Sequence, residues 1–225
     1  MASDSRPYHH GHLRPALIDA AVATVEDQGP AATSLRGVAR RAGVSHAAAT
    51  YHFGDKAGLL TAVAAEGYRR LAEALRAEDQ ASHSYLEIGV AYVRFAVNHR
   101  GYFEVMYRPE LFHPQDPALL EARAAAASEL YRGDQPDADQ MATGIAAWAL
   151  MHGVATLWLN GNMPPPLGDD PEAIARLVAK HLDVAVPGEP GADRLRTFSR
   201  AETLKSVAYP VFIQMTSLPS SPIRP

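Results

Sequence analysis

Apolar residues recur every three or four positions along most of this chain, and no stretch alternates between apolar and polar residues as a strand would. A clear case is the set Leu35, Val38, Ala39 and Ala42, which falls on one face of a helix. With the Gly and Pro stop signals, the pattern predicts an all-α protein. The predicted helices span residues 11–28, 35–42, 45–52, 56–77, 85–97, 117–132, 137–160 and 171–186.

Gly43 separates two short predicted helices at a position where the chain must turn tightly. Thr33 or Ser34 can cap the first helix and Ser45 the second, because a short hydroxyl side chain accepts a bond from a free helix N–H. Two capped short helices around a Gly-containing turn form a helix-turn-helix by pattern. An ordinary αα-hairpin is the alternative that this turn alone leaves open.

The residues of the second predicted helix indicate a surface suited to binding nucleic acid. Its polar side chains are short or neutral, so the helix can enter a major groove and offer hydrogen bonds to bases and phosphates. These candidate residues are Ser45, His46, Ala47, Thr50, Tyr51 and His52, and Lys56 follows them.

Residues 8–63 resemble the DNA-binding domain of the TetR family of transcriptional regulators. The resemblance rests on Y-H-H-G-H-L-R at 8–14, T-S-L-R-G-V-A at 33–39, A-G-V-S-H-A-A at 42–48 and H-F-G-D-K at 52–56. Two positions depart from the family pattern. The family's phosphate-binding tyrosine falls at the position of Thr50, whereas this chain has Tyr51, about 100° further around a helix. Gly37 stands where the family has an acidic or polar residue.

The resemblance implies a homodimer that places two recognition helices in successive major grooves of a palindromic operator. Phosphate contacts are then expected from Thr33 or Ser34, Tyr51, His52 and Lys56. Contacts to base edges are expected from Ser45, His46, Ala47 and Thr50. The dimer interface is expected on the last two regular helices, through Ile145, Trp148, Val154 and Leu157 of one and Ile174, Leu177, Val178 and Leu182 of the other.

The resemblance also implies the domain organisation. A three-helix helix-turn-helix domain with an N-terminal arm takes residues 1–60, and a helical ligand-binding, regulatory and dimerisation domain takes residues 61–187. A long helix beginning at Lys56 joins the two, so its tilt can carry a signal. Residues 188–225 form a Pro- and Ser-rich tail that matches nothing recognisable.

The predicted helix 137–160 contains the element W-x-x-x-H-G at Trp148, His152 and Gly153, which resembles the C-terminal domain of one TetR subgroup. Aromatic and Met residues with a few polar tips are typical of a small-molecule pocket. The effector pocket is therefore expected among Tyr92, Phe95, Phe103, Met106, Tyr107, Met151 and His152. The alternative is that these residues simply fill the core.

Composition narrows the possible functions. The 225 residues carry a net charge of −4 but six basic and five acidic residues in positions 1–60, and there is no cysteine. No apolar run reaches the roughly 20 residues of a membrane span, so a cytoplasmic protein without membrane partners is expected. The loosely spaced His9, His10 and His12 lack a carboxylate in register. They indicate a flexible arm touching phosphates, and no metal or cofactor is expected.

The expected function is a ligand-responsive transcriptional regulator, a repressor that a small apolar effector releases from its operator. The effector would favour a state whose DNA-binding heads are wrongly spaced. An activator of the same family and a non-catalytic helical interaction module are the alternatives. The chain has no nucleophile with a positioned partner and no Gly-rich phosphate loop, so it is not expected to be an enzyme.

Overall fold

The computed structural model describes residues 13–131 and 137–182, apart from the side chains of the last two. Within these ranges the regular structure is entirely helical, which confirms the predicted fold class. The histidines of the arm and the tail from residue 188 lie outside the described residues. The helices are α1 (Leu13–Ala32), α2 (Leu35–Arg41), α3 (His46–Phe53), α4 (Lys56–Ser82), α5 (Tyr85–Asn98), α6 (Arg100–Met106), α7 (Pro117–Tyr131), α8 (Ala138–Leu159) and α9 (Pro171–Leu182), with short 3₁₀ turns η1 (Pro109–Leu111) and η2 (Pro165–Leu167).

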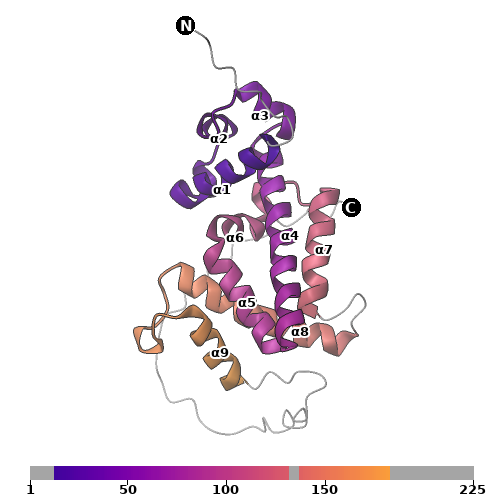
Figure 1. The fold of residues 1–225 in the computed structure, drawn as a ribbon, viewed down its shortest axis with the longest axis vertical. Coiled ribbons are helices and arrows are strands. Elements are labelled where there is room, and N and C mark those ends of the chain that lie inside the picture. The colour runs from indigo at the N-terminus through magenta and orange to yellow at the C-terminus, as the bar shows by residue number, and fades with distance from the viewer. Residues whose placement is uncertain (1–12, 132–136, 183–225) are drawn as a thin grey trace, which may run out of the picture. The chain divides into compact units, whose positions relative to one another are not determined.

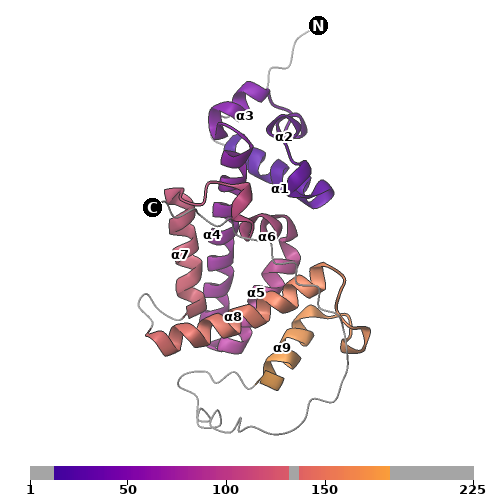
Figure 2. The ribbon, with the colours of Figure 1, turned by 180° about the vertical axis from the view of Figure 1, so that it is seen from behind.

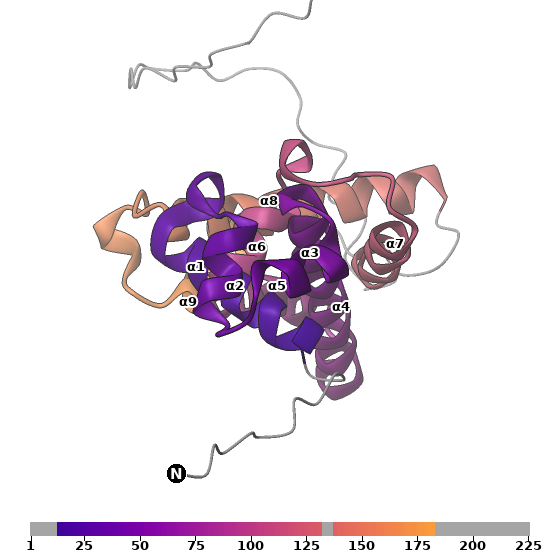
Figure 3. The same cartoon turned by 90° about the horizontal axis from the view of Figure 1, so that it is seen from above.

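Helices α1 to α3, called the head below, form the predicted helix-turn-helix, and α2 and α3 lie beside each other in Figure 3. The Ser34 hydroxyl accepts a bond from the Gly37 N–H at 3.1 Å, and the Ser45 hydroxyl accepts one from the Ala48 N–H at 3.1 Å. Gly43 has a φ of 69°, the left-handed conformation that glycine adopts without strain. Both predicted caps and the turn are therefore confirmed.

Helix α1 is interrupted where the sequence predicted its end. Gly29 has φ 77° and ψ 162°, so regular helix stops at Gln28 and a short helical turn follows from Pro30. The Thr33 hydroxyl donates to the Gly29 carbonyl at 3.1 Å and closes this turn. The break turns the chain from α1 into α2.

Helix α4 runs from the head into the remaining helices, called the body below, and lies alongside α5 and α7 (Figure 1). Its apolar residues at every fourth position, Leu59, Val63, Leu71 and Leu75, are fully buried, as the pattern predicted. The helix continues to Ser82, beyond the predicted end at residue 77, because residues 78–82 contain no Gly or Pro to stop it.

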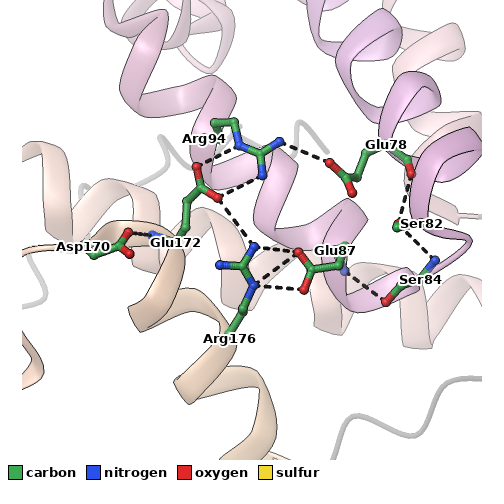
Figure 4. Close-up of polar contacts among 8 residues, drawn as sticks. All are labelled: Glu78, Ser82, Ser84, Glu87, Arg94, Asp170, Glu172 and Arg176. Atoms are coloured by element: carbon green, nitrogen blue, oxygen red, sulfur yellow. Dashed lines mark hydrogen bonds and ion pairs between the residues drawn. The ribbon is translucent and has the colours of Figure 1, made fainter.

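Helix α5 occupies the centre of the body and contacts α4, α8 and α9 (Figure 2). Ion pairs fasten α9 to this centre (Figure 4). The Arg94 guanidinium donates to Glu172 at 2.8 and 2.9 Å and to Glu78 at 3.1 Å, and Arg176 donates to Glu87 at 2.7 Å. Hydrogen bonds from Arg94 hold the pKa of Glu172 below its usual value. Because both arginines are partly solvent-exposed, these pairs orient α9 more than they stabilise the fold.

Length and composition alone would allow α8 to cross a membrane, and it is the one helix in the described ranges for which this holds. In this structure α8 packs against α5, α7 and α9.

Helix α6 packs directly on α1 of the head. The contact is close at Gly101, where an added Cβ would lie 2.8 Å from the carbonyl oxygen of Val22. The Gly101 N–H also donates to the Glu26 carboxylate at 3.2 Å. Glu26 thus caps the first turn of α6, whose own N-cap residue, His99, makes no side-chain cap bond.

We predict that Gly101→Ala destabilises the protein by about 1–3 kcal/mol, because the new methyl group meets backbone that cannot move aside. The matched control is Gly89→Ala, whose Cβ would meet only the flexible Met151 side chain at 3.1 Å. This control should be near neutral, since alanine also gains helix propensity. Urea unfolding of both variants measures the difference, and equal stabilities would show that the α1–α6 contact is not tight.

Candidate DNA-binding surface and effector site

Helix α3 turns one face inward and the other to solvent. Ala49 and Phe53, one helical turn apart, are buried against the head, and the Arg14 guanidinium lies 5.6 Å from the centre of the Phe53 ring. Tyr51 lies between them in sequence and therefore on the opposite side of the helix, where 87% of its surface is exposed. Its ring is not packed against α1 and is available to a partner.

The predicted base-contacting residues also lie on the outer face of α3. Ser45, His46, Ala47 and Thr50 are all exposed. The Ser45 hydroxyl caps the helix, and the Thr50 hydroxyl donates to the His46 carbonyl at 3.0 Å. Of the four, His46 has a polar side chain without such an intrahelical bond.

The predicted phosphate contacts differ in accessibility. Thr33 is 1% exposed and its hydroxyl is committed to Gly29, so Ser34 is the better candidate of that pair. The Lys56 ammonium donates to the Ala31 carbonyl at 2.8 Å, which leaves two of its three protons for a phosphate. His52 is half-buried, with its ring 5.5 Å from that of Tyr51.

A cleft of about 400 Å³ opens where α3 and the start of α4 meet the segment before α7. Charged side chains of both signs line it, and its two aspartates are already used as helix caps, Asp55 by Gly58 and Asp116 by Leu119. Within residues 13–131 and 137–182, no three His, Asp or Glu side chains are grouped as a metal ion would require.

A second polar site lies inside the body, around the hydroxyl of Tyr92 in α5. This oxygen lies 2.8 Å from the Tyr107 hydroxyl, 2.8 Å from His152 Nδ1 and 3.2 Å from Trp148 Nε1, whose N–H donates to it. Tyr92 is 1% exposed, whereas Tyr107, Trp148 and His152 are half-buried. We call these four residues the Tyr92 cluster.

The structure brings together some of the predicted effector residues and separates others. Phe103 joins the cluster, with its ring 5.2 Å from those of Tyr107 and His152. Met106 instead fills the space beside Gly67 of α4, and Met151 fills that beside Gly89 of α5. The ring of the remaining residue, Phe95, lies 4.9 Å from that of His99.

Two functional candidates were missed by sequence reasoning. Trp148, which the sequence placed in the dimer interface, is half-buried and donates its N–H to Tyr92 inside the body, a contact indicated only by its sharing a helix face with His152. The role of Glu26 as the cap of α6 could not be predicted from the sequence, because its partner Gly101 is 75 positions away.

Two family models match the chain. The model of bacterial regulatory proteins of the tetR family matches residues 17–63, and that of the tetracyclin repressor-like C-terminal domain matches residues 85–182, which include the W-x-x-x-H-G element. A search of the curated proteins gave no match.

Solved structures share the same fold. A protein of unknown function from Rhodococcus sp. RHA1 is 33% identical, with 79% of this chain and 96% of that chain covered and a TM-score of 0.66. A TetR family transcription regulator from Marinobacter aquaeolei VT8 is 18% identical, covers 75% and 94%, and has a TM-score of 0.57. The multidrug-binding protein EbrR, complexed with imidazole, is 26% identical, covers 74% and 93%, and has a TM-score of 0.50.

The helix-turn-helix with its exposed α3, joined by α4 to a helical body, defines a DNA-binding regulator. The chain belongs to the TetR family of bacterial transcriptional regulators. The resemblance of the helix-turn-helix region to this family is thereby confirmed over residues 17–63.

We predict that Tyr51→Phe weakens binding to specific and random DNA by a similar factor, about tenfold, because a hydroxyl bond to phosphate carries no sequence information. Thr50→Ala should leave binding nearly unchanged, since that hydroxyl is used within the helix. Lys56→Gln removes a positive charge, so the negative slope of log K against log salt should become less steep by about 0.9 per subunit. Lys56→Arg keeps the charge and should preserve the slope. Fluorescence anisotropy across a salt series measures all four variants. If Thr50→Ala weakens binding and Tyr51→Phe does not, Thr50 holds the phosphate.

Proposed function

We propose that this protein is a homodimeric transcriptional repressor that leaves a palindromic operator when a small, largely apolar effector binds its body. Exposure of Tyr51 and His46 on the outer face of α3, in a head of the TetR family, is the observation that carries this proposal. Residues 1–60 would form the DNA-binding domain and residues 61–187 the regulatory and dimerisation domain. Such a regulator has no catalytic role and acts in the cytoplasm, where bacterial DNA is found.

The proposed dimer would form through the outer faces of α8 and α9. Met141, Ile145 and Leu157 are 43–45% exposed and follow one line along α8, on which the fourth-residue spacing also places Ala149 and Gly153. Leu177 of α9 is 41% exposed. Val154 and Ile174, which the sequence assigned to this interface, are buried within their own chain and belong to the core, and the side chain of the predicted Leu182 lies outside the described residues.

Helix α6 offers a route from effector to head. Phe103 of α6 contacts Tyr92, and Tyr107, a member of the Tyr92 cluster, directly follows the helix, whereas Gly101 contacts α1 and is bonded to Glu26. An effector that displaced Phe103 would also act on Gly101, because the two residues lie two positions apart in the same short helix. The similarity to EbrR, which was solved with a small molecule, supports effector binding by the body.

Selection of bound duplexes from a random DNA pool tests the proposed function. We expect a palindrome whose half-sites are centred about one helical turn apart or a multiple of it, since two copies of α3 must read successive grooves. Recovery of a sequence without two-fold symmetry would contradict a dimeric repressor. Recovery of no preferred sequence would contradict operator binding altogether.

We predict that Gly153→Gln weakens the dimer at least about tenfold. An added Cβ at Gly153 meets no atom within 4 Å in the protomer, so the fold tolerates it, whereas a helix of a second subunit crossing there would be pushed away. Ala124→Gln on the exposed face of α7 is the matched control and should leave the dimer intact. Sedimentation over a concentration series measures both. Unchanged association of the Gly153 variant would place the interface elsewhere.

A further inference from the structure

The Tyr92 hydroxyl is bonded to three groups but has only one proton to give. Trp148 Nε1 can only donate, so Tyr92 accepts that bond. Tyr92 must then donate either to His152 Nδ1 or to the Tyr107 hydroxyl, and the group that does not receive this proton must donate to Tyr92. Two arrangements of protons therefore satisfy the cluster.

Each arrangement leaves the same pair of groups free. If Tyr92 donates to His152 Nδ1, the proton of the neutral imidazole is on Nε2, which remains a donor, and the Tyr107 oxygen remains an acceptor. If Tyr92 donates to Tyr107, His152 Nε2 is the free acceptor and the Tyr107 hydroxyl the free donor. The Trp148 N–H also interacts with the Tyr107 hydroxyl, and because a hydroxyl oxygen has two acceptor positions, Tyr107 still keeps the acceptor or the proton described above. The cluster thus always offers one donor and one acceptor.

The cluster carries no charge near neutral pH. Burial raises the pKa of Tyr107 well above its usual value and also raises that of Tyr92, so both remain hydroxyls. Burial alone lowers the pKa of His152, so the imidazole is neutral as well. An ionic ligand would lose its hydration here without gaining a partner of opposite charge, which is costly.

Aromatic rings bound the free donor and acceptor. The His152 ring lies 4.6 Å from Tyr107, 5.2 Å from Phe103 and 5.6 Å from Trp148, measured between ring centres. A ligand that met these rings where they are exposed would be favoured if it were planar, because it could continue their stacking and edge contacts. Since His152 and Tyr107 are half-buried while Tyr92 is not accessible, a ligand would meet these two residues first.

We infer that the effector is an uncharged, planar molecule with an amide-like donor and acceptor, and that His152 and Tyr107 select it through these two groups. This inference rests on the proposed effector-controlled function. It assigns a role to the W-x-x-x-H-G element, because Trp148 and His152 both bond to the Tyr92 hydroxyl. The cluster can take up either of its two proton arrangements, and the ligand would determine which one is adopted.

Ligands of one shape and different chemistry test the inference. Prodan, a neutral aromatic ketone whose emission shifts on leaving water, serves as reporter with the full-length protein. It is displaced by 2-naphthamide, 2-naphthoate, naphthalene or naphthyltrimethylammonium. We expect 2-naphthamide to displace Prodan at a concentration roughly tenfold below the others, the effect of about one net hydrogen bond in a dry site. Tyr107→Phe and His152→Phe should each reduce this advantage over naphthalene while helical content by circular dichroism stays unchanged.

Each other result overturns the inference. Preference for 2-naphthoate would show an unrecognised positive charge, and preference for the cation would show an aromatic cage for ammonium groups. Equal displacement by the amide and naphthalene would show a purely apolar pocket, and absence of saturable Prodan binding would show no pocket at all. In any of these cases, recovery of a palindromic operator would leave DNA-binding regulation standing, so the two failures are distinguishable. If His152→Phe loses helical content, His152→Gln takes its place. This variant should likewise reduce the advantage of 2-naphthamide over naphthalene.

Discussion

Burial of α4, whose residues 59–65 are covered on every side, holds together the helices on which both proposed activities depend. Leu59 and Val63, near its start, contribute to the same buried cluster as the head, and Leu71 and Leu75 lie further along in the body. The helix contacts α1, α3, α5, α6 and α7, so no other element meets as much of the described chain. Because α4 runs without a break from the head into the body, we expect a change of its tilt at one end to appear at the other.

Specific polar contacts supplement this apolar core where helices from distant parts of the chain meet. Glu26 caps α6 from α1, and the Tyr68 hydroxyl donates to the Met106 carbonyl at the other end of the same helix. Both ends of α6 are therefore fixed by side chains of other helices. A short helix held in this way can shift between two positions only by exchanging those bonds, which suits an element that transmits a ligand signal.

The Tyr92 cluster shows how a polar site can exist inside an apolar body. A hydroxyl buried without a partner would be costly, but Trp148, Tyr107 and His152 satisfy every bonding position of Tyr92. The remaining hydrogen-bonding capacity lies on Tyr107 and His152, which are half-buried. In the proposed effector site, the residues that satisfy this buried hydroxyl would also distinguish one uncharged ligand from another.

Local sequence determined the helix-turn-helix and its caps, because Ser34, Gly43 and Ser45 act on backbone groups no more than a few residues away. It also determined which faces of the helices are apolar. Only the tertiary structure decided that Thr33 is buried and that the Tyr92 hydroxyl meets a histidine 60 positions later. Such contacts depend on how helices cross, which the spacing of residues along a single helix does not specify.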